Sequence, residues 1–214
     1  MFERITAEND AGLRRLAVDL LARSTHPQAG KFLEKCLDHG DDVVRRTAYE
    51  GLVRLHGPRD FAPIDLALAK NHANIALVAV QSLAAFARED DRAHSRLVKA
   101  LDHSQQEVAR AALLSLEEVH GDNPEGDLLG LASVKHESVR RLAIVRLHQR
   151  GSLNQPRALA AVRRQLESKS ADIRQAALLA LILLRARLAS GLRERDAALH
   201  RQLFQLETLS LEPA

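Results

Sequence analysis

One pattern recurs along the chain: an aliphatic residue, an alanine four positions later and a leucine eight positions later. The six sets are Leu13-Ala17-Leu21, Val44-Ala48-Leu52, Ile75-Ala79-Leu83, Val108-Ala112-Leu116, Val139-Ala143-Leu147 and Ile173-Ala177-Leu181. Their first residues, here called anchors, are 31, 31, 33, 31 and 34 positions apart. Steps of four place side chains on one face of a helix, so each set predicts an amphipathic helix with this face in the core.

A second apolar pattern precedes five of these sets. Seven residues before each anchor from the second onward come Leu37, Leu68, Leu101, Ala132 and Leu166, each with a further aliphatic residue four positions earlier. Each repeat is therefore predicted to be a pair of helices, a first helix and a second helix. One pair cannot bury its apolar face alone, so the pairs are expected to stack into a continuous core.

The stack predicts an all-α solenoid of about six repeats that forms a single domain over residues 1–214. The second helices are expected near residues 10–23, 41–56, 72–87, 105–120, 136–150 and 170–187. Residues 193–209 carry Leu199, Leu203 and Leu206 at helical spacing and predict a C-terminal capping helix. Alanine at the centre of every second helix suits the close approach of neighbouring helices.

The start of the second helices resembles a known repeat. Asp41, Val44-Arg45 and Ala48 resemble the second helix of a HEAT repeat, and Val139-Arg140 with Ala143 is similar. The period is shorter than that of most HEAT and armadillo units, and it is closer to the compact HEAT-like repeats of bilin lyase subunits and many prokaryotic scaffolds. The resemblance covers almost the whole chain and implies a right-handed superhelix of the HEAT/armadillo type.

The last second helix is apolar on nearly all sides. Leu178, Leu179, Ile182 and Leu183 lie beyond its predicted core face. A helix of this kind is normally covered on most sides. Two alternatives stay open: the capping helix folds over it, or the chain is a segment of a longer protein or carries a docking surface there. We therefore expect a monomer, or a dimer through this C-terminal apolar helix.

The composition restricts the functional classes to which the chain could belong. The net charge of +3 is only mildly basic, and one Tyr with no Trp leaves few platforms for stacking bases. The single cysteine, Cys36, lies on an apolar helical stretch and is predicted to be a small core residue. The charged segment Phe2-Glu3-Arg4-Ile5 does not suit a signal peptide, which places the chain in the cytoplasm.

Motifs for catalysis are missing from the sequence. There is no Gly-x-Ser-x-Gly elbow, and residues 121–126 lack the Lys-Ser/Thr of a phosphate-binding loop. Three histidine pairs stand 64 residues apart, or two repeats, which indicates duplicated positions: His39 and His103, His56 and His120, His72 and His136. We therefore predict a non-enzymatic protein with no cofactor and no metal site.

Two rows of arginines mark the start of the second helices. The first row directly follows the anchors: Arg14, Arg45, Arg140 and Arg174. The second row lies one position further on: Arg15, Arg46, Arg110 and Arg141. In HEAT-like folds the first position typically pairs with acidic turn residues, which implies a structural ladder with Asp38, Asp102 and Glu167.

The second row should point outward, either as a solvated face or as a binding strip. The third repeat interrupts both rows with Ala76 and Leu77, so the strip would have an apolar middle flanked by Tyr49 and Val80. The residues predicted to bind a partner are Arg15, Arg46, Tyr49, Glu50, Leu77, Gln81, Arg110 and Arg141.

Three functions follow from these features. The leading one is a scaffold or adaptor, because the second helices of HEAT-like solenoids line a concave groove that suits a partner polypeptide. The second is nucleic-acid binding along the second row of arginines, since some HEAT-like proteins are DNA-repair glycosylases. The third is a subunit of a bilin-lyase-like enzyme, which only the resemblance supports.

Overall fold

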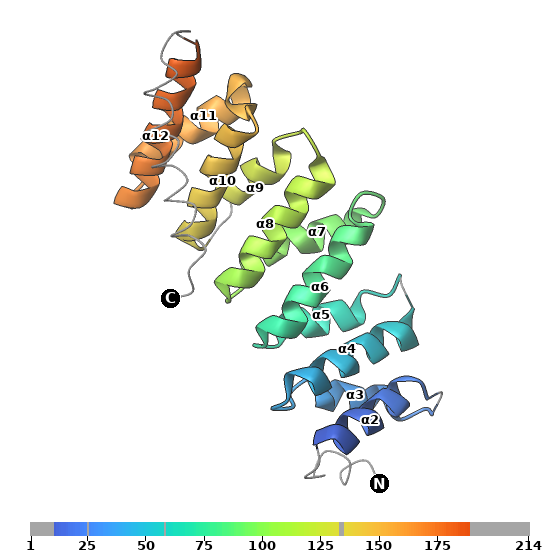
Figure 1. The fold of residues 1–214 in the computed structure, drawn as a ribbon. Helices are drawn as coiled ribbons and strands as arrows, with labels where there is room; N and C mark the ends of the chain where they lie inside the picture. Colours follow the sequence, from blue (N-terminus) through green and yellow to red (C-terminus); the bar gives the residue numbers. More distant parts are fainter. Residues whose placement is uncertain (1–10, 25, 58, 133–134, 189–214) are drawn as a thin grey trace. The chain divides into compact units, whose positions relative to one another are not determined.

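The computed structural model describes residues 11–24, 26–57, 59–132 and 135–188. Over these residues the chain is all-helical and has no strand, and its helices are labelled in Figure 1. The chain divides into two compact units, Met1–Leu83 and Ala84–Ala214, each of which is a stack of helix pairs.

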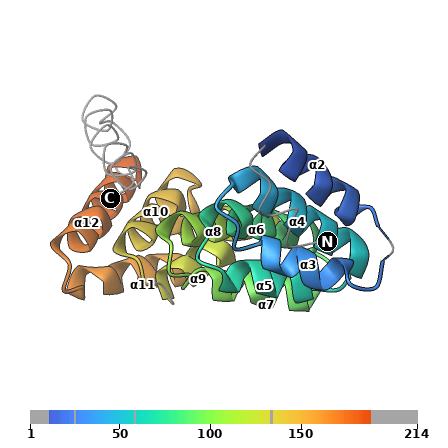
Figure 2. The same cartoon turned by 90° about the horizontal axis from the view of Figure 1, so that it is seen from below.

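The N-terminal unit has its helices in two rows. The second helices α2 (Ala11–Ala22), α4 (Asp42–His56) and most of α6 (Ala73–Phe86) form one row, and the first helices α3 (Ala29–Cys36) and α5 (Ala62–Ala69) form the other (Figure 2). Helix α4 packs on α2, α3 and α5, so it lies at the centre of this unit.

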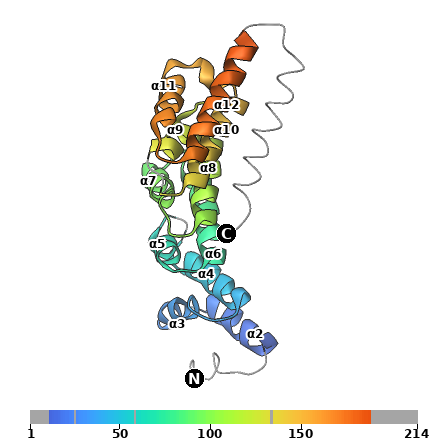
Figure 3. The same ribbon diagram turned by 90° about the vertical axis from the view of Figure 1, so that its left-hand side faces the viewer.

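The C-terminal unit repeats the arrangement. Its first helices are α7 (Asp91–Ala100), α9 (Glu125–Ala132) and α11 (Pro156–Arg164), and its second helices are α8 (Gln106–His120), α10 (Glu137–Gln149) and α12 (Ala171–Leu188). The two rows lie side by side in Figure 3. Two 3-10 turns, Ser152–Asn154 and Gln165–Glu167, flank α11. Each first helix packs on the second helix that follows it, which gives the stacked pairs of an α-solenoid.

The second helices begin and end within one residue of their predicted bounds. The predicted capping helix at residues 193–209 lies outside the described residues. That all 214 residues form one domain stays a prediction. None of the helices that the structure describes combines the length and apolar character that a membrane crossing needs.

Local signals explain where the second helices begin and end. Helix α4 begins after Asp41, whose carboxylate accepts a hydrogen bond of 2.9 Å from the Val43 N–H and so satisfies a donor of the first turn. Helices α4 and α8 end at Gly57 and Gly121, which have φ of 83° and 59°. This region of backbone conformation favours glycine, because it has no Cβ.

The core follows the register of the repeat. The central alanines Ala48, Ala79, Ala112, Ala143 and Ala177 are all fully buried. The position five residues after each of the first five anchors is buried as well, as Val18, Tyr49, Val80, Leu113 and Ile144. Five residues correspond to about 140° around a helix, so this position lies at the edge that faces the next repeat.

The first set departs from this register. Leu13 is 55% exposed, and Leu16 and Leu20 on the same face of α2 are exposed as well. The prediction that Leu13 is a core residue is wrong. Leu13 lies on the first described helix, so no described repeat precedes it to cover its side of α2.

The central alanines give a direct test of the packing. Ala112→Leu inserts three carbons at a fully buried position of α8, and we expect it to lower the free energy of unfolding by about 1–3 kcal/mol because overpacking forces neighbouring helices apart. Urea unfolding followed by circular dichroism measures the change. Ala160→Leu on the exposed face of α11 is the control and should stay within about 0.5 kcal/mol of the parent chain. Equal effects of the two substitutions would contradict the packing.

Candidate interaction surface

Three of the four second-row arginines are held in ion pairs. Arg15 lies 3.0 Å from Asp41 in the next repeat, and Arg141 lies 3.0 Å from Asp172 in the next repeat. Arg46 lies 3.0 Å from Glu50, one turn along the same helix. Desolvation opposes ionisation of Asp41, but hydrogen bonds from Val43 and Arg15 outweigh it and lower the pKa of this carboxyl below its usual value. The row is therefore largely neutralised by the protein itself.

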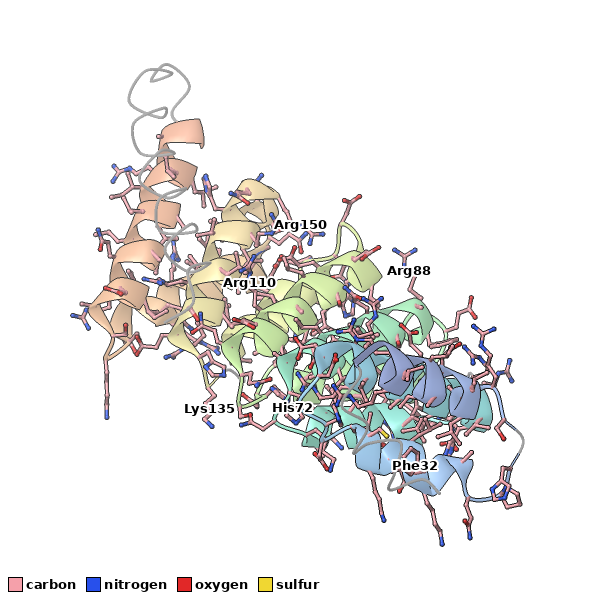
Figure 4. The ribbon with its side chains drawn as sticks, turned by 60° about the horizontal axis from the view of Figure 1, so that its bottom comes forward. Phe32, His72, Arg88, Arg110, Lys135 and Arg150 are labelled. Atoms are coloured by element: carbon pink, nitrogen blue, oxygen red, sulfur yellow. The ribbon has the colours of Figure 1, made fainter. Side chains whose placement is uncertain are left out.

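Arg110 is the exception in this row. It is half-buried on α8, its Nε is buried without an acceptor, and it makes no ion pair with any described residue (Figure 4). The repeat explains the difference. Arg141 pairs with Asp172, which directly precedes an anchor, whereas the corresponding residue in the repeat after Arg110 is Ser138.

The first-row arginines bond mainly to nearby turns. Arg45 is buried and donates to the His39 carbonyl, to Asp42 and to the Asn74 side chain of the next repeat. Arg174 donates to the carbonyls of Ser168 and Lys169 at 2.7 and 2.9 Å. Arg140 lies 3.8 Å from Glu137, one turn earlier on α10.

The implied acidic partners of this row are engaged elsewhere. Asp38 pairs with Lys70 at 2.6 Å, and Asp102 accepts the Lys135 N–H at 3.1 Å. Both contacts join the turn of one repeat to the turn of the next. The ladder between repeats therefore exists, but its acidic residues hold lysine side chains and backbone N–H groups in place of the predicted arginines.

The predicted apolar middle of the strip is not a surface. Tyr49 is buried, and its hydroxyl lies 3.3 Å from the Ser82 hydroxyl. Burial raises the pKa of Tyr49, although the Ser82 hydrogen bond partly offsets it. Val80 is also fully buried, and Leu77 is half-buried. The prediction that Tyr49 contacts a partner is wrong, because it lies five residues after its anchor and faces the next repeat.

The exposed polar residues on the second helices carry both charges. On α4 and α6 the exposed residues include Arg46, Glu50 and Gln81, and on α8 they include Glu107 and Glu118. A surface of this kind offers hydrogen bonds and ion pairs to a partner of mixed charge. It does not form a continuous positive track.

A buried polar cluster joins α8, α9 and α10 in the C-terminal unit. Gly126 lies so close to α8 that an added Cβ would meet the Leu116 carbonyl carbon and the Glu117 nitrogen at 2.8 Å. This contact brings Asp127, which is fully buried, beside the buried Glu117. The Nε of Arg146 lies 3.0 Å from Glu117.

Asp127 is poorly compensated for a buried carboxylate. Neither of its oxygens accepts a hydrogen bond from an N–H group of the described residues, and the nearby Arg150 Nη1 is 3.7 Å from Oδ2. Burial and the neighbouring carboxylate of Glu117 together raise the pKa of Asp127 to about 8, against the opposing charges of Arg150 and Arg146. The raised pKa favours the protonated form of Asp127 at neutral pH.

The duplicated histidines have structural roles at the turns. His39 Nδ1 accepts the Asp41 N–H at 2.9 Å, and His103 Nδ1 accepts the Gln105 N–H at 3.1 Å, so both serve as turn acceptors two repeats apart. His136 Nε2 donates to the His103 carbonyl at 2.7 Å. The described residues contain no group of three or more metal-ligating side chains. Burial raises the pKa of Cys36 to about 11, so its thiol is not a poised nucleophile.

Comparison with known proteins identifies the class. The model of HEAT repeats matches residues 1–84 and 94–182, which is most of the chain. The chain therefore belongs to the HEAT repeat family. Among solved structures it resembles the crystal structure of an engineered protein, with 17% identity, a TM-score of 0.33, and coverage of 84% of this chain and 94% of the other. No curated protein matches the sequence.

The raised pKa of Asp127 predicts how stability depends on pH. Its pKa is about 8 in the folded chain and near 3.8 when unfolded, so the folded state binds the extra proton between these values and stability falls as the pH rises from about 4 to 8. Asp127→Asn mimics the protonated carboxyl and removes this loss. We expect the variant to be more stable than the parent chain at pH 9 by at least about 1 kcal/mol, since each pKa unit corresponds to about 1.4 kcal/mol.

Urea unfolding at pH 5, 7 and 9 measures the effect. Asp122→Asn, in the exposed turn after α8, is the matched control and should leave the pH dependence of the parent chain unchanged. A variant Asp127→Asn that loses stability with rising pH as steeply as the parent would show that Asp127 is ionised in the folded chain.

Proposed function

We propose that the chain is a cytoplasmic, non-enzymatic scaffold that binds a partner polypeptide along the exposed face of its second helices. HEAT repeats generally serve as protein-interaction scaffolds, and the chain belongs to this family. The observation that carries the proposal is the mixed charge of the second-helix face, where Arg46, Glu50 and Gln81 are exposed together. Such a face suits a peptide or helix that presents both donors and acceptors.

Ion pairing weakens the alternative of nucleic-acid binding. A protein that follows a phosphate backbone needs cations that are free to replace counterions. Arg15, Arg46 and Arg141 already neutralise carboxylates within the protein, and Arg110 alone in its row has no such partner. The only tyrosine, Tyr49, is buried and cannot stack on a base.

The alternative of a bilin-lyase-like subunit has little support at the level of side chains. Among the described residues, the most strongly shifted carboxyl is that of Asp127, which is fully buried and not exposed to solvent. The similar repeat length of this chain and bilin lyase subunits indicates a similar fold, but it does not indicate similar chemistry.

A paired set of variants tests the binding face. In the face variant Arg46, Glu50 and Gln81 of α4 and α6 become alanine; in the control variant Lys31, Glu34 and Lys35 of α3 become alanine. We expect the face variant to retain about tenfold less partner than the parent chain in a pull-down from the source cell, which corresponds to about 1.4 kcal/mol. The control variant should retain as much partner as the parent chain.

Nuclease treatment and a salt series complete the experiment. Retention that survives nuclease and changes little with salt supports a polypeptide partner. Loss on nuclease treatment, together with a mobility shift of duplex DNA that weakens steeply with salt, would instead support nucleic-acid binding. Equal losses for the face variant and the control variant would contradict the proposed face.

We further propose that a second copy of the chain docks on α12. Leu178 and Ile182 lie five and nine residues after their anchor and are 51% and 40% exposed. In α8 and α10 the residues at these positions are buried: Leu113 and Glu117, and Ile144 and His148. The same face that joins successive repeats is thus open on α12, and the α12 helix of a second copy would cover it with matching apolar residues.

Light scattering of the full chain at high concentration tests this dimer. The parent chain, of 23.6 kDa, should give about twice its mass. The double variant Leu178→Ser, Ile182→Ser should be monomeric, whereas Leu55→Ser, at another exposed leucine, should leave the mass unchanged. A parent chain that stays monomeric would contradict the dimer and favour the capping helix predicted at residues 193–209.

A further inference from the structure

Two histidines that are distant in sequence face each other in the C-terminal unit. His94 lies on α7, and His120 is the last residue of α8, the helix that packs on α7. Their Nε2 atoms are 2.9 Å apart, and their rings are nearly perpendicular, with centroids 5.0 Å apart. Both side chains are half-buried, so the pair is reachable from solvent.

The contact accommodates one proton between the two Nε2 atoms. A single proton on one Nε2 can be donated to the lone pair of the other, but a second proton would place two N–H groups against each other. Neutral imidazole is the form that ligates metals.

We propose that His94 and His120 bind a divalent transition-metal ion through their two Nε2 atoms, with water in its other positions. Metal–imidazole bonds are about 2.0–2.1 Å, so two nitrogens that subtend a right angle at the ion are about 2.9 Å apart. This is the separation in the structure. Rotation of the rings turns the two lone pairs toward a common point, and the proton shared at Nε2 transfers through solvent to Nδ1 of the same ring when the ion enters.

The ligand chemistry selects among metals. Two imidazoles with open positions bind Cu²⁺ more tightly than Ni²⁺ or Zn²⁺, and a right-angle pair suits the tetragonal geometry of Cu²⁺. Both ligands are imidazole nitrogens, whereas Mg²⁺ and Ca²⁺ prefer oxygen ligands, so these hard cations are poor candidates. The site would be open and exchangeable, unlike a closed structural zinc site.

The surrounding charges are close to balanced. His120 ends α8, where the helix dipole favours a cation. Glu125 adds negative charge, but Arg157 pairs with it at 2.6 Å. Arg88 lies nearby and donates to the Glu118 carbonyl at 2.7 Å. Binding therefore depends on the two imidazoles themselves, which makes their removal a sharp test.

The N-terminal unit provides a matched control. His56 is the last residue of α4 and stands 64 positions before His120, at the same place in its repeat. Its Nδ1 lies 2.7 Å from Asp60. The residue 64 positions before His94 is Gly30, so this repeat has no second imidazole at that place.

Titration of the full chain with Cu²⁺ alone, in a buffer that does not coordinate metals, tests the site. Calorimetry should detect one tight site per chain, and electron paramagnetic resonance should show two nitrogen ligands. His94→Gln and His120→Gln keep a polar side chain at each position and should each weaken this site by at least about 10–100-fold, the loss that follows removal of even an outer-shell partner. His56→Gln should bind Cu²⁺ as the parent chain does.

Thermal unfolding gives a second readout, because an ion that binds across α7 and α8 in the folded chain stabilises it. Cu²⁺ should raise the Tm of the parent chain and of His56→Gln and leave that of His94→Gln and His120→Gln unchanged. Equal affinities in all four proteins, or a spectrum with a single nitrogen ligand, would overturn the proposal. The two histidines would then form only a hydrogen-bonded contact between helices.

Discussion

The close approach of the second helices is the constraint on which the rest of the structure depends. In α4, α6, α8 and α10 the second helix is buried along its anchor, its central alanine and the residue five positions after the anchor. Alanine at the centre permits this approach, because a larger side chain would hold the helix axes apart. Once three edges of a helix are buried, only a narrow polar face is left for partners.

That geometry decides which arginines can act on a partner. The second row lies where one repeat meets the next, so an acidic residue at the start of the following helix captures the guanidinium, as Asp41 and Asp172 do. Capture between repeats neutralises charge that would otherwise face solvent. Arg110 has no such pair: Ser138 stands at the place that Asp172 has for Arg141, and Leu114 at the place that Glu50 has for Arg46. A protein-binding face of mixed charge follows from this arrangement more naturally than a phosphate-binding strip.

Periodicity predicts the helices and most of the core, because the spacing of apolar residues on a helix is a property of neighbouring residues. Periodicity does not predict the burial of a side chain where that burial depends on another repeat. Leu13 has the anchor pattern but no described repeat to cover it, and Tyr49 looks like a surface aromatic until the next repeat buries it. The ion-pair partners of Asp38 and Asp102 also come from other turns. Contacts of this kind depend on which repeats are adjacent, not on spacing within one helix.

The two most unusual groups of the C-terminal unit illustrate the same limit. From the sequence alone, Asp127 would be expected to be an ordinary surface acid. Only the contact of Gly126 with α8 places it against Glu117 in the core. His94 has no duplicate two repeats away, so the periodicity that relates His56 to His120 does not reveal it. Both features arise where α8 ends, at a place where the N-terminal unit has Gly30 and the pair of His56 with Asp60. Duplication therefore conserved the helices of the two units while the chemistry at the ends of the equivalent helices diverged.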